Sequence, residues 1–168
     1  MNIRKKWLHW LKEILIFFLL LFGISYFVNA FRAPHPTGAS PAQLHGDTLK
    51  GSPVGELLRG EGPLLLHFWG TWCPVCRQEA GNLERVARHY RVLTVAVNSG
   101  SPDEIRRWMK ARGLDYPVLA DPTGRWAQRF DVTVYPSSFI YDASGKLRFV
   151  ETGYTTTLGL LARLKLAE

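Results

Sequence analysis

A strand that leads through a short turn into a helix is the strongest constraint that the sequence places on its fold. Residues 64–69 form an almost unbroken apolar run of strand length, which is typical of a strand covered on both faces. After the turn, Pro74 is a favourable first helical residue because it has no amide hydrogen to leave unpaired. Apolar side chains then recur at helical spacing up to Tyr90. The sequence therefore predicts a strand, a turn and a helix, with Cys73 at the start of the helix.

The chain after residue 90 alternates between strand and helix and then ends in a hairpin and a last helix. Ser101 has the signature of a helix start, because a proline and two acids follow it, and Gly113 marks the end of that helix. The expected strands are residues 64–69, 91–97, 137–141 and 146–151, and the expected helices are residues 74–90, 101–113, 123–130 and 157–167. This order predicts an α/β fold, with a mixed central sheet covered by helices on both faces. A small hairpin or turn is expected before it, at 47–58.

The spacing of the two cysteines, Cys73 and Cys76, favours a reactive thiol pair over a structural disulfide. Cys73 precedes the first helical residue, where the amide groups and the helix dipole favour an anion and are expected to lower the pKa of its thiol. Cys76 lies one turn further on the same helix face, within reach of a disulfide. We therefore expect Cys73 to attack a substrate sulfur and Cys76 to resolve the mixed disulfide. A structural disulfide is disfavoured, since the loop it would close is too short to stabilise much.

Metal binding by the two thiols is the alternative from another class of function. A structural zinc site needs four ligands, and the sequence has no second cysteine pair and no histidines at ligand spacing. A cuprous ion can be held by two thiolates, so a copper-binding module remains open, although no methionine or third thiol lies nearby in the sequence. We expect neither a resident metal nor a bound cofactor.

The N-terminal part of the chain has the composition of a membrane anchor. Residues 14–31 run 18 positions without a charged side chain, about the length that crosses a hydrocarbon layer as a helix. Basic side chains are concentrated at 1–13, and the positive-inside rule leaves that segment in the cytoplasm. A signal peptide cleaved after Ala30 is the alternative. Both interpretations predict that everything after residue 31 lies outside the cytoplasm.

Composition separates a linker from a domain and argues against nucleic-acid binding. Residues 32–46 hold three prolines among small and polar residues, and we expect them to link the anchor to a domain at 47–168. Residues 1–31 account for +3 of the formal net charge of +7. The remaining +4 is spread over 137 residues that include 13 acids, which is an ordinary mixed surface.

The segment at 68–76, Phe-Trp-Gly-Thr-Trp-Cys-Pro-Val-Cys, closely resembles thioredoxins, and in particular the membrane-anchored TlpA/ResA/DsbE-like group. Segments at 116–124 and 134–145 resemble later landmarks of that group in the same order, so the likeness covers roughly residues 47–167. The Cys-Pro-Val-Cys motif with a short anchor is most similar to the copper-sensitivity suppressor (ScsD-like) branch. The resemblance implies a thioredoxin-like fold, held in the periplasm by a single-pass anchor in a bacterial inner membrane.

The same resemblance implies a substrate-binding rim around the cysteines. Pro136 matches the cis-proline that faces the cysteine pair, and Tyr135 before it presents its backbone to a substrate strand. Without the resemblance, Pro136 would be read as an ordinary proline at a strand start, because a cis bond is uncommon even before proline. Trp69 and Trp72 are expected to pack around the site and shape its rim, and Trp72 and Pro74 join Tyr135 and Pro136 as candidate substrate-binding residues.

Two titratable residues near the pair are candidates for proton transfer. Glu79 matches the acid that the group carries one turn after the second cysteine, which implies a proton-relay role, and the alternative is a solvated helix carboxylate. His67 departs from thioredoxin, which has a buried aspartate six residues before the first cysteine. It could act as a neutral base, stabilise a thiolate as a cation, or be a core histidine satisfied by a backbone carbonyl.

Anchored members of this group are mostly reductants, which implies a monomeric reductase of protein disulfides or of cysteines in cytochrome c maturation or copper stress. A membrane thiol-disulfide electron carrier (DsbD-like) would then supply the electrons, and protein thiols or disulfides would be the substrates. A protein thiol oxidase remains the alternative, because the dipeptide of Cys73 and Pro74 is common to both kinds of enzyme.

Overall fold

The computed structural model describes residue 7 and residues 10–20, 23–24 and 40–168. The chain divides into two units, Met1–Ala33 and Pro34–Glu168. The described residues of the first unit are helical and exposed. Within the described part of the chain, no helix has both the length and the apolar character needed to cross a membrane. The predicted cleavage position after Ala30, part of the predicted anchor and most of the predicted linker lie outside the described residues.

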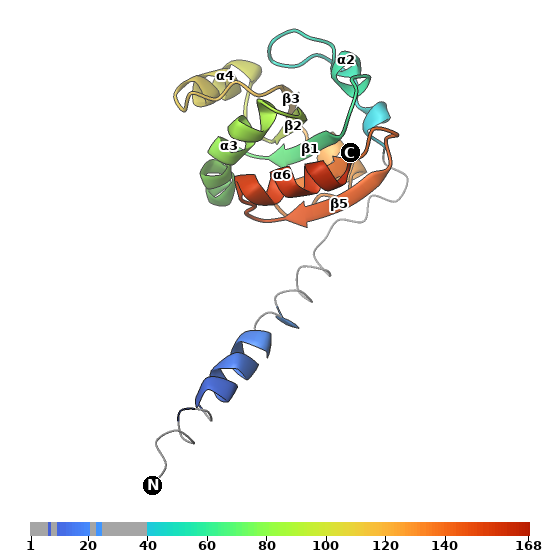
Figure 1. Ribbon diagram of the computed structural model, residues 1–168. Coiled ribbons are helices and arrows are strands. Elements are labelled where there is room, and N and C mark those ends of the chain that lie inside the picture. Colours follow the sequence, from blue (N-terminus) through green and yellow to red (C-terminus); the bar gives the residue numbers. More distant parts are fainter. Residues whose placement is uncertain (1–6, 8–9, 21–22, 25–39) are drawn as a thin grey trace. The chain divides into compact units, whose positions relative to one another are not determined.

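A five-stranded mixed sheet forms the centre of the second unit (Figure 1). Its strand order is β3-β2-β1-β4-β5. Strands β1, β2 and β3 run parallel, whereas β4 pairs antiparallel with β1 and β5 pairs antiparallel with β4. The strands are β1 (Leu64–Trp69), β2 (Arg91–Val97), β3 (Val118–Asp121), β4 (Ser137–Tyr141) and β5 (Leu147–Thr152). This confirms the predicted α/β class and the mixed sheet.

Helices cover both faces of the sheet, because alternate side chains of each strand point to opposite sides. Leu65 and Trp69 of β1 pack in one apolar cluster, and Leu64, Leu66 and Phe68 pack in the other. The first cluster is covered by α3 (Pro74–Ala87), α4 (Pro102–Lys110) and α6 (Thr157–Leu166), and the second by α2 (Val54–Leu58) and α5 (Arg125–Arg129). The central strands are therefore buried on both sides, as their unbroken apolar runs predict.

The predicted element bounds differ from the observed ones mainly at helix ends. Strands β1, β2 and β4 match the prediction, but β3 was missed because it has only four residues and is defined by its pairing with β2. Helix α4 ends at Lys110 rather than Gly113, since the chain tightens into short turns there, with the amide of Gly113 donating to Lys110. The predicted hairpin at 47–58 is one bridge between Asp47 and Pro53 followed by α2.

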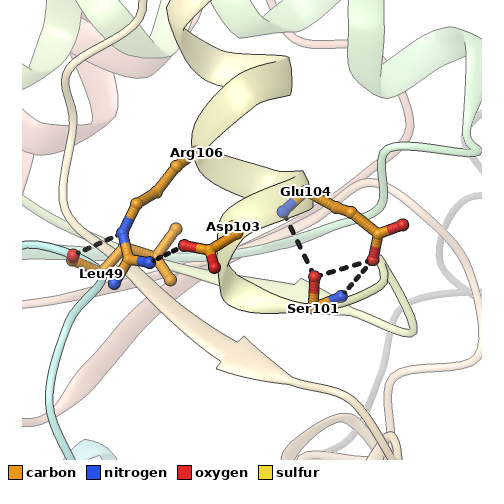
Figure 2. Close-up of polar contacts among 5 residues, drawn as sticks. All are labelled: Leu49, Ser101, Asp103, Glu104 and Arg106. Atoms are coloured by element: carbon orange, nitrogen blue, oxygen red, sulfur yellow. Dashed lines mark hydrogen bonds and ion pairs between the residues drawn. The ribbon is translucent and has the colours of Figure 1, made fainter.

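The segment before the sheet packs on the domain. A 3-10 helix, η1 (Pro41–Gln43), lies at the end of the predicted linker, and Leu44 after it is buried. Further on, the amide of Leu49 donates to the carbonyl of Val118, and Arg106 Nε donates to the carbonyl of Leu49 at 3.0 Å (Figure 2). Contacts with the domain therefore begin before residue 47, at Leu44, and continue at Leu49 along the edge of the sheet formed by β3.

Helix α4 has a complete capping box at its start, which Figure 2 shows. The Ser101 hydroxyl accepts the amide hydrogen of Glu104, and the Glu104 carboxylate accepts the amide hydrogen of Ser101 at 2.7 Å. Asp103 in the same turn pairs with Arg106 at 2.6 Å. The helix start predicted at Ser101 is confirmed, and its Arg106 also holds the segment around Leu49.

Candidate functional site

Cys73 and Cys76 lie at the carboxyl end of β1, where the chain turns into α3. Cys73 is the N-cap of α3 in extended conformation, Pro74 is its first residue, and the amide of Cys76 donates to Cys73 Sγ at 3.1 Å. A disulfide joins the two residues, whose Cα atoms are 5.3 Å apart, and the two side chains are 4% and 2% exposed. The predicted geometry is confirmed: Cys73 stands at the positive end of the helix dipole, where a thiolate is favoured.

A loop that comes later in the chain, just before β4, faces the cysteine pair. The peptide bond between Tyr135 and Pro136 is cis, as the resemblance implies. The carbonyl oxygen of Tyr135 lies 3.8 Å from Cys73 Sγ, and Pro136 is buried just before β4. The backbone at Tyr135 is thus close to the sulfur that a substrate would meet, while its role in substrate binding remains a prediction.

Trp72 forms the exposed rim of the site. Its side chain is 48% exposed, its Nε1 donates to the carbonyl of Val97 at 3.0 Å, and its ring meets that of Tyr135 edge-on at 5.3 Å. Gly70 makes this position possible, because a Cβ atom there would lie 2.5 Å from the indole. The turn is also fixed by Ser99, whose hydroxyl accepts the amide hydrogen of Thr71 at 3.0 Å. The rim therefore depends on β2 as well as on the motif.

Glu79 is fully buried in α3, one turn beyond Cys76. The alternative of a solvated helix carboxylate is therefore wrong. Neither carboxylate oxygen has a hydrogen-bond donor in ordinary geometry among the described residues. Burial raises its pKa to about 8, and the main chain at Thr155 acts in the opposite direction. Glu79 can therefore change protonation near neutral pH on the helix face it shares with Cys76.

His67 is buried in β1, on the face that α3 covers, since it alternates with Phe68 and lies on the side of Leu65 and Trp69. Its Nδ1 lies 2.8 Å from the hydroxyl of Ser138, its partner across β1 and β4. Burial lowers the pKa of His67 to about 3. Burial therefore favours the neutral imidazole over the cation in this disulfide form, and the partner of His67 is a hydroxyl rather than a backbone carbonyl.

Several groups of the site had no signal in the sequence that named them. Ser138 and Ser99 are ordinary small polar residues, and only strand pairing and turn geometry place them beside His67 and Thr71. Among the described residues, no group of three or more His, Cys, Asp or Glu side chains is arranged to hold a metal ion. The redox-active sulfur atoms are the chemical centre of the site.

Comparisons with known proteins agree with this geometry. The model of the AhpC/TSA family matches residues 39–150. A thioredoxin-like protein of Haemophilus influenzae is 31% identical over 163 residues, which are 94% of this chain and 95% of that protein. Thiol-disulfide oxidoreductase ResA of Bacillus subtilis is 35% identical over 103 residues, 59% of this chain and 57% of its own length. The crystal structure of a secreted Mycobacterium tuberculosis disulfide oxidoreductase homologous to E. coli DsbE is similar with a TM-score of 0.63 and 27% identity, covering 75% of this chain and 97% of that one.

Proposed function

This chain belongs to the AhpC/TSA family and is a thiol-disulfide oxidoreductase, and from that premise we propose that it acts as a reductant of protein disulfides outside the cytoplasm. The observation that carries the proposal is the position of Cys73. Its sulfur caps α3, accepts the amide hydrogen of Cys76, and lies 3.8 Å from the backbone of the loop at Tyr135. A substrate disulfide that binds along this loop meets the sulfur that the helix start favours as a thiolate.

The reaction in the reducing direction has two displacements. The Cys73 thiolate attacks one substrate sulfur, a bond forms between them, and the other substrate sulfur leaves as a thiolate and takes up a proton. Cys76 then gives up its proton, and its sulfur attacks Cys73 Sγ. This step releases the second substrate thiolate and leaves the disulfide between Cys73 and Cys76 that the structure contains. Two electrons and the proton of Cys76 pass from the protein to the products, and the other proton that the two product thiols carry is taken up from solvent.

Glu79 is the group we assign to the proton of Cys76. Cys76 must lose a proton in the second displacement, and Glu79 lies three residues further on the same face of α3, fully buried. With a pKa of about 8, the carboxyl group can accept and return a proton near neutral pH. We assign His67 a different role. It is a neutral group whose hydrogen bond with Ser138 joins β1 to β4.

The surroundings of the pair support the reducing direction. A dithiol protein becomes a strong oxidant when its reduced, thiolate form is strongly stabilised. The helix start stabilises the thiolate of Cys73, but the two buried titratable side chains on the covered face add no positive charge, because His67 is neutral and Glu79 is either neutral or negative. An ionised Glu79 would instead oppose a thiolate at Cys76.

The proposed location of the protein in the cell rests on its sequence. The uncharged run at 14–31 and the basic residues before it support a single-pass anchor, with the thioredoxin-like domain in the periplasm of a bacterial inner membrane. A membrane thiol-disulfide carrier of the DsbD kind would then reduce the Cys73–Cys76 disulfide after each turnover. Cytochrome c maturation and copper stress, the latter in a ScsD-like role, are the settings that we propose for its substrates.

The redox state in living cells tests the direction. Thiols are blocked by alkylation at the moment of lysis, and the full chain is compared in cells with and without the membrane thiol carrier. A reductase is mostly reduced when the carrier is present and oxidised when it is absent. Protein that stays oxidised in both would contradict the proposal and favour an oxidase.

A trapping variant tests the assigned roles of the cysteines. Cys76→Ser is expected to accumulate mixed disulfides through Cys73, because the resolving sulfur is missing, and the matched Cys73→Ser variant is expected to accumulate few. Tight cuprous binding by the reduced wild type, without turnover of any disulfide, would instead indicate a copper-binding module.

A further inference from the structure

An open groove of about 440 Å³ lies beside the cysteine site, between the loop at Tyr135 and the end of β2. Two of its lining residues also belong to the site. The carbonyl of Tyr135 lies near Cys73 Sγ, and the carbonyl of Val97 accepts the indole hydrogen of Trp72. The groove therefore lies next to the place where a substrate sulfur must bind, and Tyr135 and Val97 belong to both.

Several residues that line the groove are polar, and one of them is negatively charged. Asn98, Gln128 and Thr133 contribute amides and a hydroxyl, and Asp131 is the one charged residue among those that line it. Asp131 is exposed, and its carboxylate makes no ion pair or hydrogen bond with any residue that the structure describes. A free carboxylate at the edge of a polar groove is suited to a cation.

The arginines of the neighbouring helix α5 do not neutralise this carboxylate. Arg125 lies over the ring of Trp126, with its guanidinium carbon 5.3 Å from the ring centre. Arg129 Nε donates to the side chain of Gln43 at 2.9 Å. Both line an adjoining cavity, together with His45 and with Gln128, which it shares with the groove. A second carboxylate, that of Asp121, is buried at the start of α5, where it accepts two amide hydrogens. Asp131 is thus the one charged residue of the lining, and neither arginine of α5 pairs with it in this structure.

The backbone of the groove is held in an uncommon conformation at two points. Asn98 has φ 46° and Asp131 has φ 54°, both in the left-handed region, which asparagine and aspartate enter more readily than other residues with a side chain. Residues in such conformations persist where the surrounding structure fixes them, and they are frequent at ligand-binding sites.

We propose that this groove binds the polypeptide segment that flanks the target cysteine of a substrate, and that Asp131 selects a lysine or arginine in that segment. The inference rests on the proposed function, since it concerns the substrates of the same sulfur. It adds a specificity-determining residue outside the motif, on the loop between α5 and the cis-proline.

Peptides that each carry one cysteine as a mixed disulfide with thionitrobenzoate test the proposal. The coloured thiolate is released when the reduced, full-length protein attacks the peptide disulfide, and the second-order rate constant is measured. Lysine, leucine or glutamate is placed at successive positions on either side of the cysteine. At one or more positions, the lysine peptide is expected to react roughly three to ten times faster than the glutamate peptide at low salt, and this ratio should shrink at high salt.

Asp131→Asn is the decisive variant, because asparagine also tolerates the left-handed conformation and keeps the size of the side chain. The ratio between lysine and glutamate peptides is expected to fall to less than about twofold. Glu61→Gln is the matched control. It removes an exposed acid before β1, at the opposite end of the strand from the cysteines, and should leave the ratio unchanged.

The outcomes separate this inference from the function on which it rests. Release of thionitrobenzoate without any preference for lysine would overturn the role of Asp131 and leave the oxidoreductase intact. A lysine preference that persists in Asp131→Asn would also overturn it. No release with any peptide would contradict the proposed function itself.

Discussion

Glu79 and His67 are two buried titratable residues whose pKa values move in opposite directions from the same cause. Burial disfavours charge, so the pKa of the acid rises to about 8 and that of the base falls to about 3. The native protein therefore holds Glu79 protonated and His67 unprotonated over the middle of the pH range. Each change of pKa is also a change of stability with pH.

Glu79 is expected to make the oxidised protein less stable as the pH rises. Its native pKa of about 8 lies above the ordinary value of 4.5 for a glutamate, so the native state holds the proton more tightly, and this contribution is lost between about pH 4.5 and 8. A shift of this size corresponds to about 5 kcal/mol at most. Urea denaturation of the oxidised protein at pH 6.5 and 8.5 measures the loss. Glu79→Gln should reduce it strongly, and an equal loss in the variant would show that Glu79 is hydrated.

His67 is expected to act in the opposite direction on the acid side. Its native pKa is lowered from 6.5 to about 3, so the unfolded state binds the proton more tightly, and stability is lost as the pH falls from about 6.5 to 3. Between pH 4.5 and 6.5 the two residues offset each other. His67→Gln should be less stable at pH 7, because the new side chain fits the site poorly, yet lose less stability on acidification. Acid denaturation curves that keep their wild-type slope would contradict this.

Among the elements, the turn from β1 into α3 sets the geometry of the site. We expect replacement of its glycine, Gly70, to destabilise the protein. A Cβ atom on Gly70 would lie 2.5 Å from the Trp72 ring. Gly70→Ala is expected to displace the indole from the carbonyl of Val97 and to destabilise the protein by roughly 1–3 kcal/mol. Thermal denaturation and the fluorescence of the tryptophans measure the two effects.

Gly81, in the next element, provides the matched control. It lies in the interior of α3 on an exposed position, and a Cβ atom there would meet nothing within 4 Å. Gly81→Ala is expected to stabilise the protein by roughly 0.5–1 kcal/mol, because alanine loses less backbone freedom in a helix. Destabilisation by both substitutions would mean that the close contact at Gly70 does not explain its effect.

At the scale of the whole molecule, the thioredoxin-like unit has its own core on both faces of the sheet. Its apolar clusters are drawn from residues 44–167. A variant without residues 1–33 is therefore expected to fold and to keep its exchange activity in solution. If residues 14–31 anchor the protein, the full chain is found in the membrane fraction and the shortened variant in the soluble fraction. A full-length chain that is already in the soluble fraction would contradict the anchor.

The fold was largely predictable because its signals are local. The apolar runs at β1 and β2 and the capping box at Ser101 each lie within a few neighbouring residues. Strand β3 was missed, since a four-residue strand is defined by its pairing with β2 rather than by its own pattern. The cis bond before Pro136 was predictable only from the resemblance, because nothing in the neighbouring sequence distinguishes that proline from others.

The sequence by itself determined the reacting pair: the spacing of Cys73 and Cys76, with proline between them, is enough to place two sulfur atoms at a helix start. Only the tertiary structure decided the surroundings. Glu79 is buried close to the main chain of Thr155. His67 contacts Ser138 across the pairing of β1 with β4, although the two residues are 71 positions apart in the chain. Burial sets the direction of both pKa shifts, and burial by distant parts of the chain cannot be read from residues that are neighbours in sequence.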